Sequence, residues 1–172
     1  MTRLIPQHIS QLAFISAAIM PIGGIVSYQY GYYGSMIIQG CLYTTTVLYW
    51  NNIDYSRTMR KIDMFVVILF SINSFCITVM YFDNKNKILC VLSDIGTVII
   101  YFANNHIFQH QILNPHKNIM NQSYSYFSLQ YTLPNSSQRE SAYYYNVLVH
   151  CFFLHLITIS TLMYGLFMNT NV

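Results

Sequence analysis

The sequence predicts an all-α membrane protein, a multi-pass transmembrane helical bundle of about five spans that forms a single domain over residues 1–172. Of its 172 residues, 54% are hydrophobic and only 8% are charged. An ordinary soluble domain carries roughly 25% charged residues, so this composition cannot cover a water-facing surface of the same size. The apolar residues also fall into runs that approach the length of one bilayer crossing.

Charge and cysteine content exclude several classes of partner. Lysine and arginine together number eight, against five acidic residues, and the largest basic cluster is the short group Arg57, Arg60 and Lys61. We therefore expect no nucleic acid partner, and take the lipid bilayer and other membrane subunits as the candidate partners. The cysteines lack CxxC spacing, which predicts small buried hydrophobic residues instead of a disulfide framework or a zinc knuckle.

The first two spans are predicted at residues 10–28 and 36–50. No small-residue cleavage site follows the first apolar run, so we expect an uncleaved span, kinked near Pro21, Gly23 and Gly24. The small residues Ser16, Ala17 and Ala18 would let a neighbouring helix approach closely. In the second span one face repeats polar and aromatic residues at helical spacing, which is typical of a helix packed against protein; these residues are Gln39, Tyr43, Thr46 and Trp50.

The third and fourth spans, predicted at residues 63–81 and 88–104, each contain an aspartate. Asp63 is placed in the first turn of its helix, where the helix dipole and nearby Arg60 favour a carboxylate. Asp94 lies well inside its apolar run and should face a partner or water, or be protonated. Tyr101 and Asn105 share its helical face. The polar stretch FDNKNK between the two spans predicts adjacent antiparallel helices.

A polar loop is predicted at residues 105–144, followed by the last span at 145–167. This span contains His150 and His155, which a simple membrane anchor would not need. On an α-helix residues five apart point about 140° away from each other, so the sequence predicts that the two imidazoles diverge. We expect Asn146 beside His150 and Cys151 beside His155, each at i, i+4 spacing.

The basic residues predict the topology. With five spans, one side holds Arg3, Arg57, Arg60, Lys61, Lys117 and Arg139, and the other holds Lys85 and Lys87. The positive-inside rule then favours a cytoplasmic N-terminus, in a membrane that the sequence does not identify. Both N-x-S sequons, at Asn121 and Asn135, would face the cytoplasm and stay unmodified.

Two groups of residues are candidates for chemistry. Asp63, Asp94 and His150 are the candidate catalytic residues, because ionisable groups at membrane depth are costly and often functional. The candidate metal ligands are His150 and His155, together with His106 and His110, whose i, i+4 spacing on a helix suits two metal ligands. For the histidines in the last span, interhelical hydrogen bonding is the competing interpretation.

The order Thr46-Val47-Leu48-Tyr49-Trp50, then Asp63, then Asn146-x3-His150 resembles the superfamily of intramembrane metal-dependent hydrolases that includes alkaline ceramidases and the adiponectin and progestin receptors. That family has seven spans, with Ser-x3-His, Asp and His-x3-His at the matching places. The resemblance implies a zinc-dependent lipid amide hydrolase. Here, however, Thr46 stands for the serine, and Trp50 and Asn146 stand for two of the three zinc-binding histidines.

Three functions remain open from the sequence, and we rank a non-catalytic membrane or assembly component first. The alternatives are an intramembrane hydrolase of a lipid amide or ester, with zinc as its cofactor, and a small transporter or proton relay through Asp94 and His150. The motifs of nucleotide-binding and soluble hydrolytic enzymes are missing from the sequence. The most useful observation for separating a functional site from ordinary helix packing is a set of distances, those among His150, His155, Asp63 and Asp94. Bringing these groups together in lipid would be costly, so packing alone would not explain it.

Overall fold

Every element in the described part of the chain is helical, which confirms the predicted all-α class. The computed structural model describes residues 7–51, 57–107 and 137–169. Its elements are α1 (Gln7–Ala17), α2 (Ile19–Gln29), α3 (Tyr33–Asn51), α4 (Arg57–Tyr81), α5 (Asn84–Ile107), α6 (Ser137–His150), the π-helix η2 (Cys151–Ile157) and α7 (Thr158–Asn169). The helices thus extend into the predicted polar loop, whereas the sequons at Asn121 and Asn135 lie outside the described residues.

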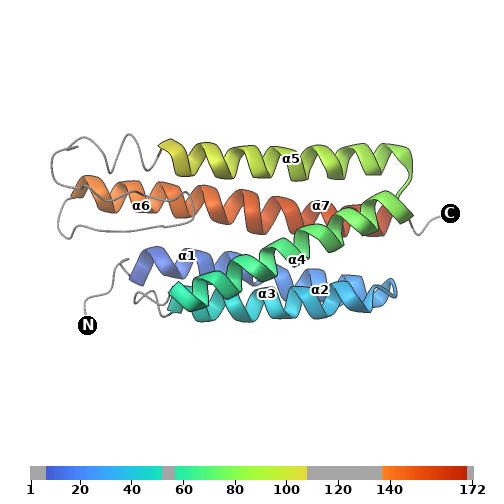
Figure 1. Cartoon of the computed structure of the whole chain (residues 1–172), viewed down its shortest axis with the longest axis horizontal. Coiled ribbons are helices and arrows are strands. Elements are labelled where there is room, and N and C mark those ends of the chain that lie inside the picture. Colours follow the sequence, from blue (N-terminus) through green and yellow to red (C-terminus); the bar gives the residue numbers. More distant parts are fainter. Residues whose placement is uncertain (1–6, 52–56, 108–136, 170–172) are drawn as a thin grey trace.

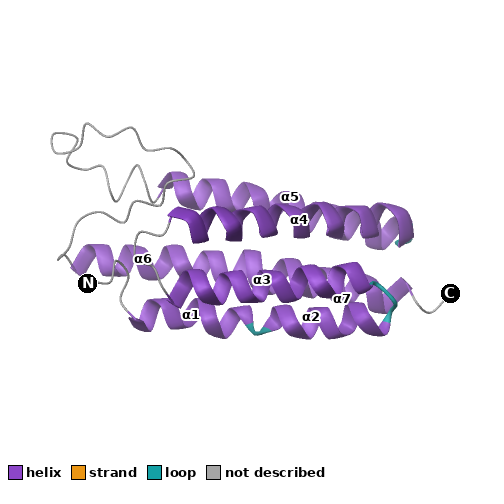
Figure 2. Cartoon of the chain, turned by 60° about the horizontal axis from the view of Figure 1, so that its bottom comes forward, coloured by secondary structure: helices purple, strands orange, loops and turns teal. Residues whose placement is uncertain are grey.

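The helices form five rods that run lengthwise through the molecule (Figure 1). α1 and α2 make the first rod, and α6, η2 and α7 are continuous in the last. Figure 2 shows α4 and α5 together on one side, with the other rods beneath them. Within the described part of the chain, four segments are long and apolar enough to cross a membrane: Gln7–Gln29, Lys61–Tyr81, Asn84–Asn104 and Tyr144–Asn169. α3, the second predicted span, is not among them, because Gln39 and three consecutive threonines make it more polar.

The first rod is broken at Ala18, between α1 and α2, which is earlier than the kink predicted at Pro21, Gly23 and Gly24. A proline ring clashes with the carbonyl four residues before it and has no N–H to bond that carbonyl. For Pro21 this carbonyl belongs to Ala17, the residue at which α1 ends. The proline therefore does cause the break, but one turn towards the N-terminus.

The turn between α2 and α3 is a Schellman motif centred on Gly31. The Gly31 amide donates to the Tyr28 carbonyl at 3.0 Å, and the Tyr32 amide donates to the Ser27 carbonyl at 2.8 Å. This pair of bonds needs a left-handed residue just past the helix end, and Gly31 has a φ of 81°. The turn satisfies the last carbonyls of α2 and reverses the chain within a few residues.

The turn between α4 and α5 is fixed to the end of α7. Asp83 caps α5, since its Oδ1 accepts the Asn86 amide at 2.8 Å, as an N-cap aspartate does. The Asp83 amide in turn donates to Asn169 Oδ1 at 2.6 Å. The predicted short connection between antiparallel helices is confirmed, and its ends are held by the last rod.

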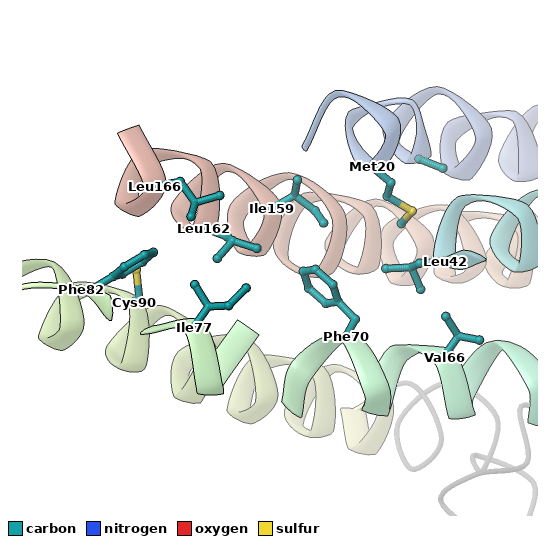
Figure 3. Close-up of a cluster of buried hydrophobic side chains, with 11 residues drawn as sticks. Met20, Leu42, Val66, Phe70, Ile77, Phe82, Cys90, Ile159, Leu162 and Leu166 are labelled. Carbon is teal, nitrogen blue, oxygen red and sulfur yellow. The ribbon is translucent and has the colours of Figure 1, made fainter. Parts of the chain in front are cut away.

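A hydrophobic cluster fills the space between α2, α3, α4, α5 and α7 (Figure 3). In this view Phe70 and Ile77 on α4 point towards Ile159 and Leu162 on α7. Cys90 belongs to the cluster and Cys151 is also buried, as predicted. Cys41 and Cys76 are exposed, so the prediction of burial was wrong for them: they lie on the outer faces of their helices.

Candidate functional site

His150 and His155 lie against each other, which corrects the prediction that they diverge. Their ring centroids are 5.0 Å apart, with the planes at 80°. The chain from Cys151 to Ile157 is a π-helix, whose i→i+5 bonding brings residues five apart towards one face. Thr158 supports this turn, because its hydroxyl donates to the Phe153 carbonyl at 3.0 Å. The predicted angle between the two imidazoles assumed an α-helix. The wider turn of the π-helix brings His150 and His155 to the same side.

His155 is tied to the first rod through Ser16. The Ser16 hydroxyl and His155 Nδ1 are 2.7 Å apart, and both side chains are buried. Ser16 donates its one hydroxyl hydrogen to the Ala13 carbonyl at 3.1 Å, so Nδ1–H of His155 is the donor to Ser16. The π-helix therefore faces the first rod at the point where that rod breaks.

His150 is surrounded by aromatic rings from other helices. Its ring centroid lies 5.7 Å from that of Trp50 on α3 and 6.3 Å from that of Tyr101 on α5. Asn146, one turn earlier on α6, is buried, and its Nδ2 has no hydrogen-bond partner among the described residues. Asn146 and His150 share a helical face as predicted. The group formed by His150, His155, Ser16, Trp50 and Tyr101 joins four of the five rods, and we call it the histidine cluster.

Asp63 takes part in a separate polar contact between α3 and α4. Its Oδ1 accepts the Thr45 hydroxyl at 2.9 Å and the Thr46 hydroxyl at 3.1 Å. α4 begins at Arg57 and has no acidic residue in its first turn, so the predicted first-turn position of Asp63 was wrong. The carboxylate is held by two hydroxyl donors from the neighbouring helix. Thr46 and Trp50 are one turn apart on α3, which puts Asp63 close to the histidine cluster without joining it.

Asp94 lies apart from both groups. It makes no hydrogen bond or ion pair with any described residue, and the Cys90 thiol lies one turn earlier on the same helix. Tyr101, the α5 residue that contacts His150, is seven residues further on, or about 10 Å along the helix. At mid-membrane an aspartate costs about 2.5–3.5 kcal/mol on insertion scales. No contact among the described residues joins Asp94 to His150, and their pairing stays a prediction.

The residues that the structure describes do not fit a catalytic zinc ion. Such an ion needs three protein ligands and one open position, and no group of three or more His, Cys, Asp or Glu side chains able to hold a metal occurs among the described residues. Trp50 stands where the hydrolase family has a zinc-binding histidine. An indole N–H can only donate a hydrogen bond, so Trp50 cannot replace that ligand. The His106 side chain and the whole of His110 lie outside the described part of the chain.

A buried polar network between α2 and α3 was only partly expected. Gln39 Nε2 donates to Ser27 Oγ at 2.9 Å and to Ser35 Oγ at 3.1 Å. The polar stripe of the second span predicted that Gln39 faces protein, and Gln39 is fully buried. The i, i+4 spacing of Ser35 and Gln39 was available as a signal. The distant Ser27, like Ser16 opposite His155, could be assigned only from the packing.

Comparisons with known proteins give no relative: no family model, no curated protein and no solved structure matches this chain.

Proposed function

We propose that this chain is a non-catalytic, multi-pass integral membrane protein that works as a component of a membrane assembly. The observation that carries the proposal is that polar side chains within its helices bond to one another across helix interfaces. Ser16 pairs with His155, Thr45 and Thr46 pair with Asp63, and Ser93 pairs with Thr161 at 3.1 Å. Such bonds contribute about 0.6 kcal/mol each on average, and they position helices instead of leaving groups free to react.

The surface of the bundle supports the assembly part of the proposal. In the most apolar 18-residue stretch of α4, only 22% of the residues are buried inside the chain, and in that of α5 only 17%. These two helices therefore offer long faces to lipid or to another membrane protein. We also propose that α3 crosses with the other four rods, since it runs alongside them (Figure 1), which gives five crossings and a cytoplasmic N-terminus. Glycosylation at Asn121 or Asn135 would contradict this orientation.

The intramembrane hydrolase is the second candidate, and two contacts favour it. Thr46 bonds to Asp63 and Trp50 packs against His150, so positions that resemble the hydrolase family lie next to each other across three helices. The same contacts explain why we rank the non-catalytic function first. The Trp50 ring stands where the resemblance implies a histidine ligand.

Zinc content and a restoration variant separate the two candidates. The full chain, purified in detergent and supplied with zinc, should hold less than stoichiometric metal and leave a long-chain ceramide intact. The double variant Trp50→His with Asn146→His completes a three-histidine set with His150, and Trp50→Phe with Asn146→His is its matched control. Zinc binding by the wild-type chain, lost in His150→Ala, would overturn the non-catalytic proposal.

The assembly itself is tested by size. Extracted in a mild detergent from the membrane of cells that make it, the chain should migrate as part of a complex well above its own mass of 20.1 kDa. Migration as a single chain surrounded by detergent would contradict this part of the proposal.

A further inference from the structure

Asp94 lies at the centre of the span that the chain itself covers least. The span runs from Asn84 to Asn104, so Asp94 is ten residues from either end. At 1.5 Å per residue this is about 15 Å from each end, half the thickness of a bilayer's hydrocarbon core. The carboxyl group is therefore at the depth where the membrane offers least compensation for its charge.

The two aspartates inside the spans differ in what they contact. Asp63 accepts two threonine hydroxyls from α3, whereas Asp94 bonds to no described residue. Asp94 also stands at the border between two faces of α5. Cys90, one turn before it, is buried, and Val98, one turn after it, is 53% exposed. Its carboxyl group is accordingly within reach of a helix that packs against the outer face.

The outer face around Asp94 is apolar and sterically open. It presents large exposed side chains, namely Leu92, Ile95, Val98 and Ile99. A Cβ added at Gly96 would meet nothing within 4 Å, so a partner backbone can approach closely there. An apolar surface with one acidic group at its centre is complementary to a helix that is apolar except for one basic group at the same depth.

We propose that Asp94 is the docking point for a transmembrane helix of a different protein, which carries a lysine or arginine at the bilayer midplane. This inference rests on the proposed role in a membrane assembly and names the chemistry of the partner. The helix packs along the outer face of α5, and its cation pairs with the Asp94 carboxylate. A second copy of this chain is a poorer occupant, because none of its described helices has a lysine or arginine near its centre.

The test uses the full-length chain and a synthetic helix of known sequence. The probe is a leucine-rich transmembrane peptide with one central lysine, and the matched probes have leucine there or have the lysine moved by two turns. Energy transfer from donor-labelled chain to acceptor-labelled peptide is measured in phosphatidylcholine vesicles. We expect the central-lysine peptide to bind about tenfold more tightly than the leucine peptide. Asp94→Asn and Asp94→Leu should remove this difference, and Asp63→Asn should keep it.

Equal binding of the three peptides, or a preference that survives Asp94→Leu, would overturn the proposal. Self-association of the chain that is lost in Asp94→Asn would overturn it in favour of a second copy. These outcomes are separate from the size measurement above. A large native complex together with no lysine preference refutes the docking point and retains the assembly role, whereas a single-chain particle refutes the role itself. Each variant is first checked for retained helicity and wild-type resistance to unfolding by sodium dodecyl sulfate.

Discussion

Polar residues on the helix faces that pack inside the bundle differ from Asp94, which borders the outer face of α5. In the most apolar stretch of the first span, Gln7–Gln29, 44% of the residues are buried, against 17% in the most apolar stretch of α5. Ser16, Ser27 and Gln39 on those inner faces are each bonded to a neighbouring helix, whereas Asp94 on α5 has no such bond within the described residues. A polar residue in a membrane helix thus has two meanings, and its position in the bundle decides between them. Towards the bundle interior, a polar side chain bonds to a neighbouring helix; at the outer face of α5, Asp94 is the residue for which we propose an external partner.

The largest contrast should come from two isoleucines. Ile159 is fully buried and Ile95 is 51% exposed. Ile159→Ala leaves a cavity and should cost about 2 kcal/mol of unfolding free energy, whereas Ile95→Ala should cost close to nothing, because lipid chains replace the lost contacts. Sodium dodecyl sulfate titration of the chain in bicelles measures both. Equal costs would show that α5 is covered by protein even in the isolated chain.

Two glycines provide the next contrast. A Cβ at Gly23 would overlap Gln39 Oε1 and would lie 2.7 Å from the Ile159 side chain, whereas a Cβ at Gly96 has open space around it. Gly23→Ala should therefore cost about 1–3 kcal/mol through overpacking. Gly96→Ala should leave stability unchanged or raise it, since alanine is the better helix former. The same titration measures the pair, and a neutral Gly23→Ala would contradict the close contact between α2 and α3.

The two aspartates should respond in opposite directions. Asp63→Ala removes the acceptor of two threonine hydroxyls and should lower the unfolding free energy by about 1–2 kcal/mol. Asp94→Ala removes a carboxyl group that bonds to no described residue, and should leave the isolated chain equally stable or more so, because a carboxyl group at membrane depth is costly. Thermal aggregation of the purified variants is a sufficient measure. A destabilised Asp94→Ala variant would mean that Asp94 has an internal partner.

The smallest expected effect concerns Ser16. Ser16→Ala removes the acceptor for His155 Nδ1 and should cost about 1 kcal/mol. Ser71→Ala on α4 is the control, because the Ser71 hydroxyl bonds only to the Val67 carbonyl of its own helix on an exposed face. Comparison of the two in the detergent titration isolates the interhelical bond. Equal effects would show that the Ser16–His155 contact does not hold the first rod to the last.

Much of the fold could be predicted because its signals are local. The apolar runs predicted the helical class, and Pro21 predicted a break within one turn of its observed place. The stretch FDNKNK predicted the turn between α4 and α5, where Asp83 caps the start of α5. The polar face of the second span correctly placed Gln39, Thr46 and Trp50 against protein, whereas Tyr43, the fourth residue of that face, is 37% exposed. These features depend on residues within a few positions of one another, where spacing alone determines the geometry.

The candidate site could be predicted only in part, because it depends on contacts between distant segments. The ionisable residues themselves were visible, but the approach of His155 to His150 required a π-helix, which α-helical spacing does not reveal. Likewise nothing near Asp63 in the sequence names Thr45 and Thr46 as its donors. The sequence by itself determined that the chain is a helical membrane protein with a few costly polar groups at depth. The tertiary structure alone decided which groups are paired, and that Asp94 has no hydrogen-bond partner among the described residues, because pairing depends on which helix faces lie together.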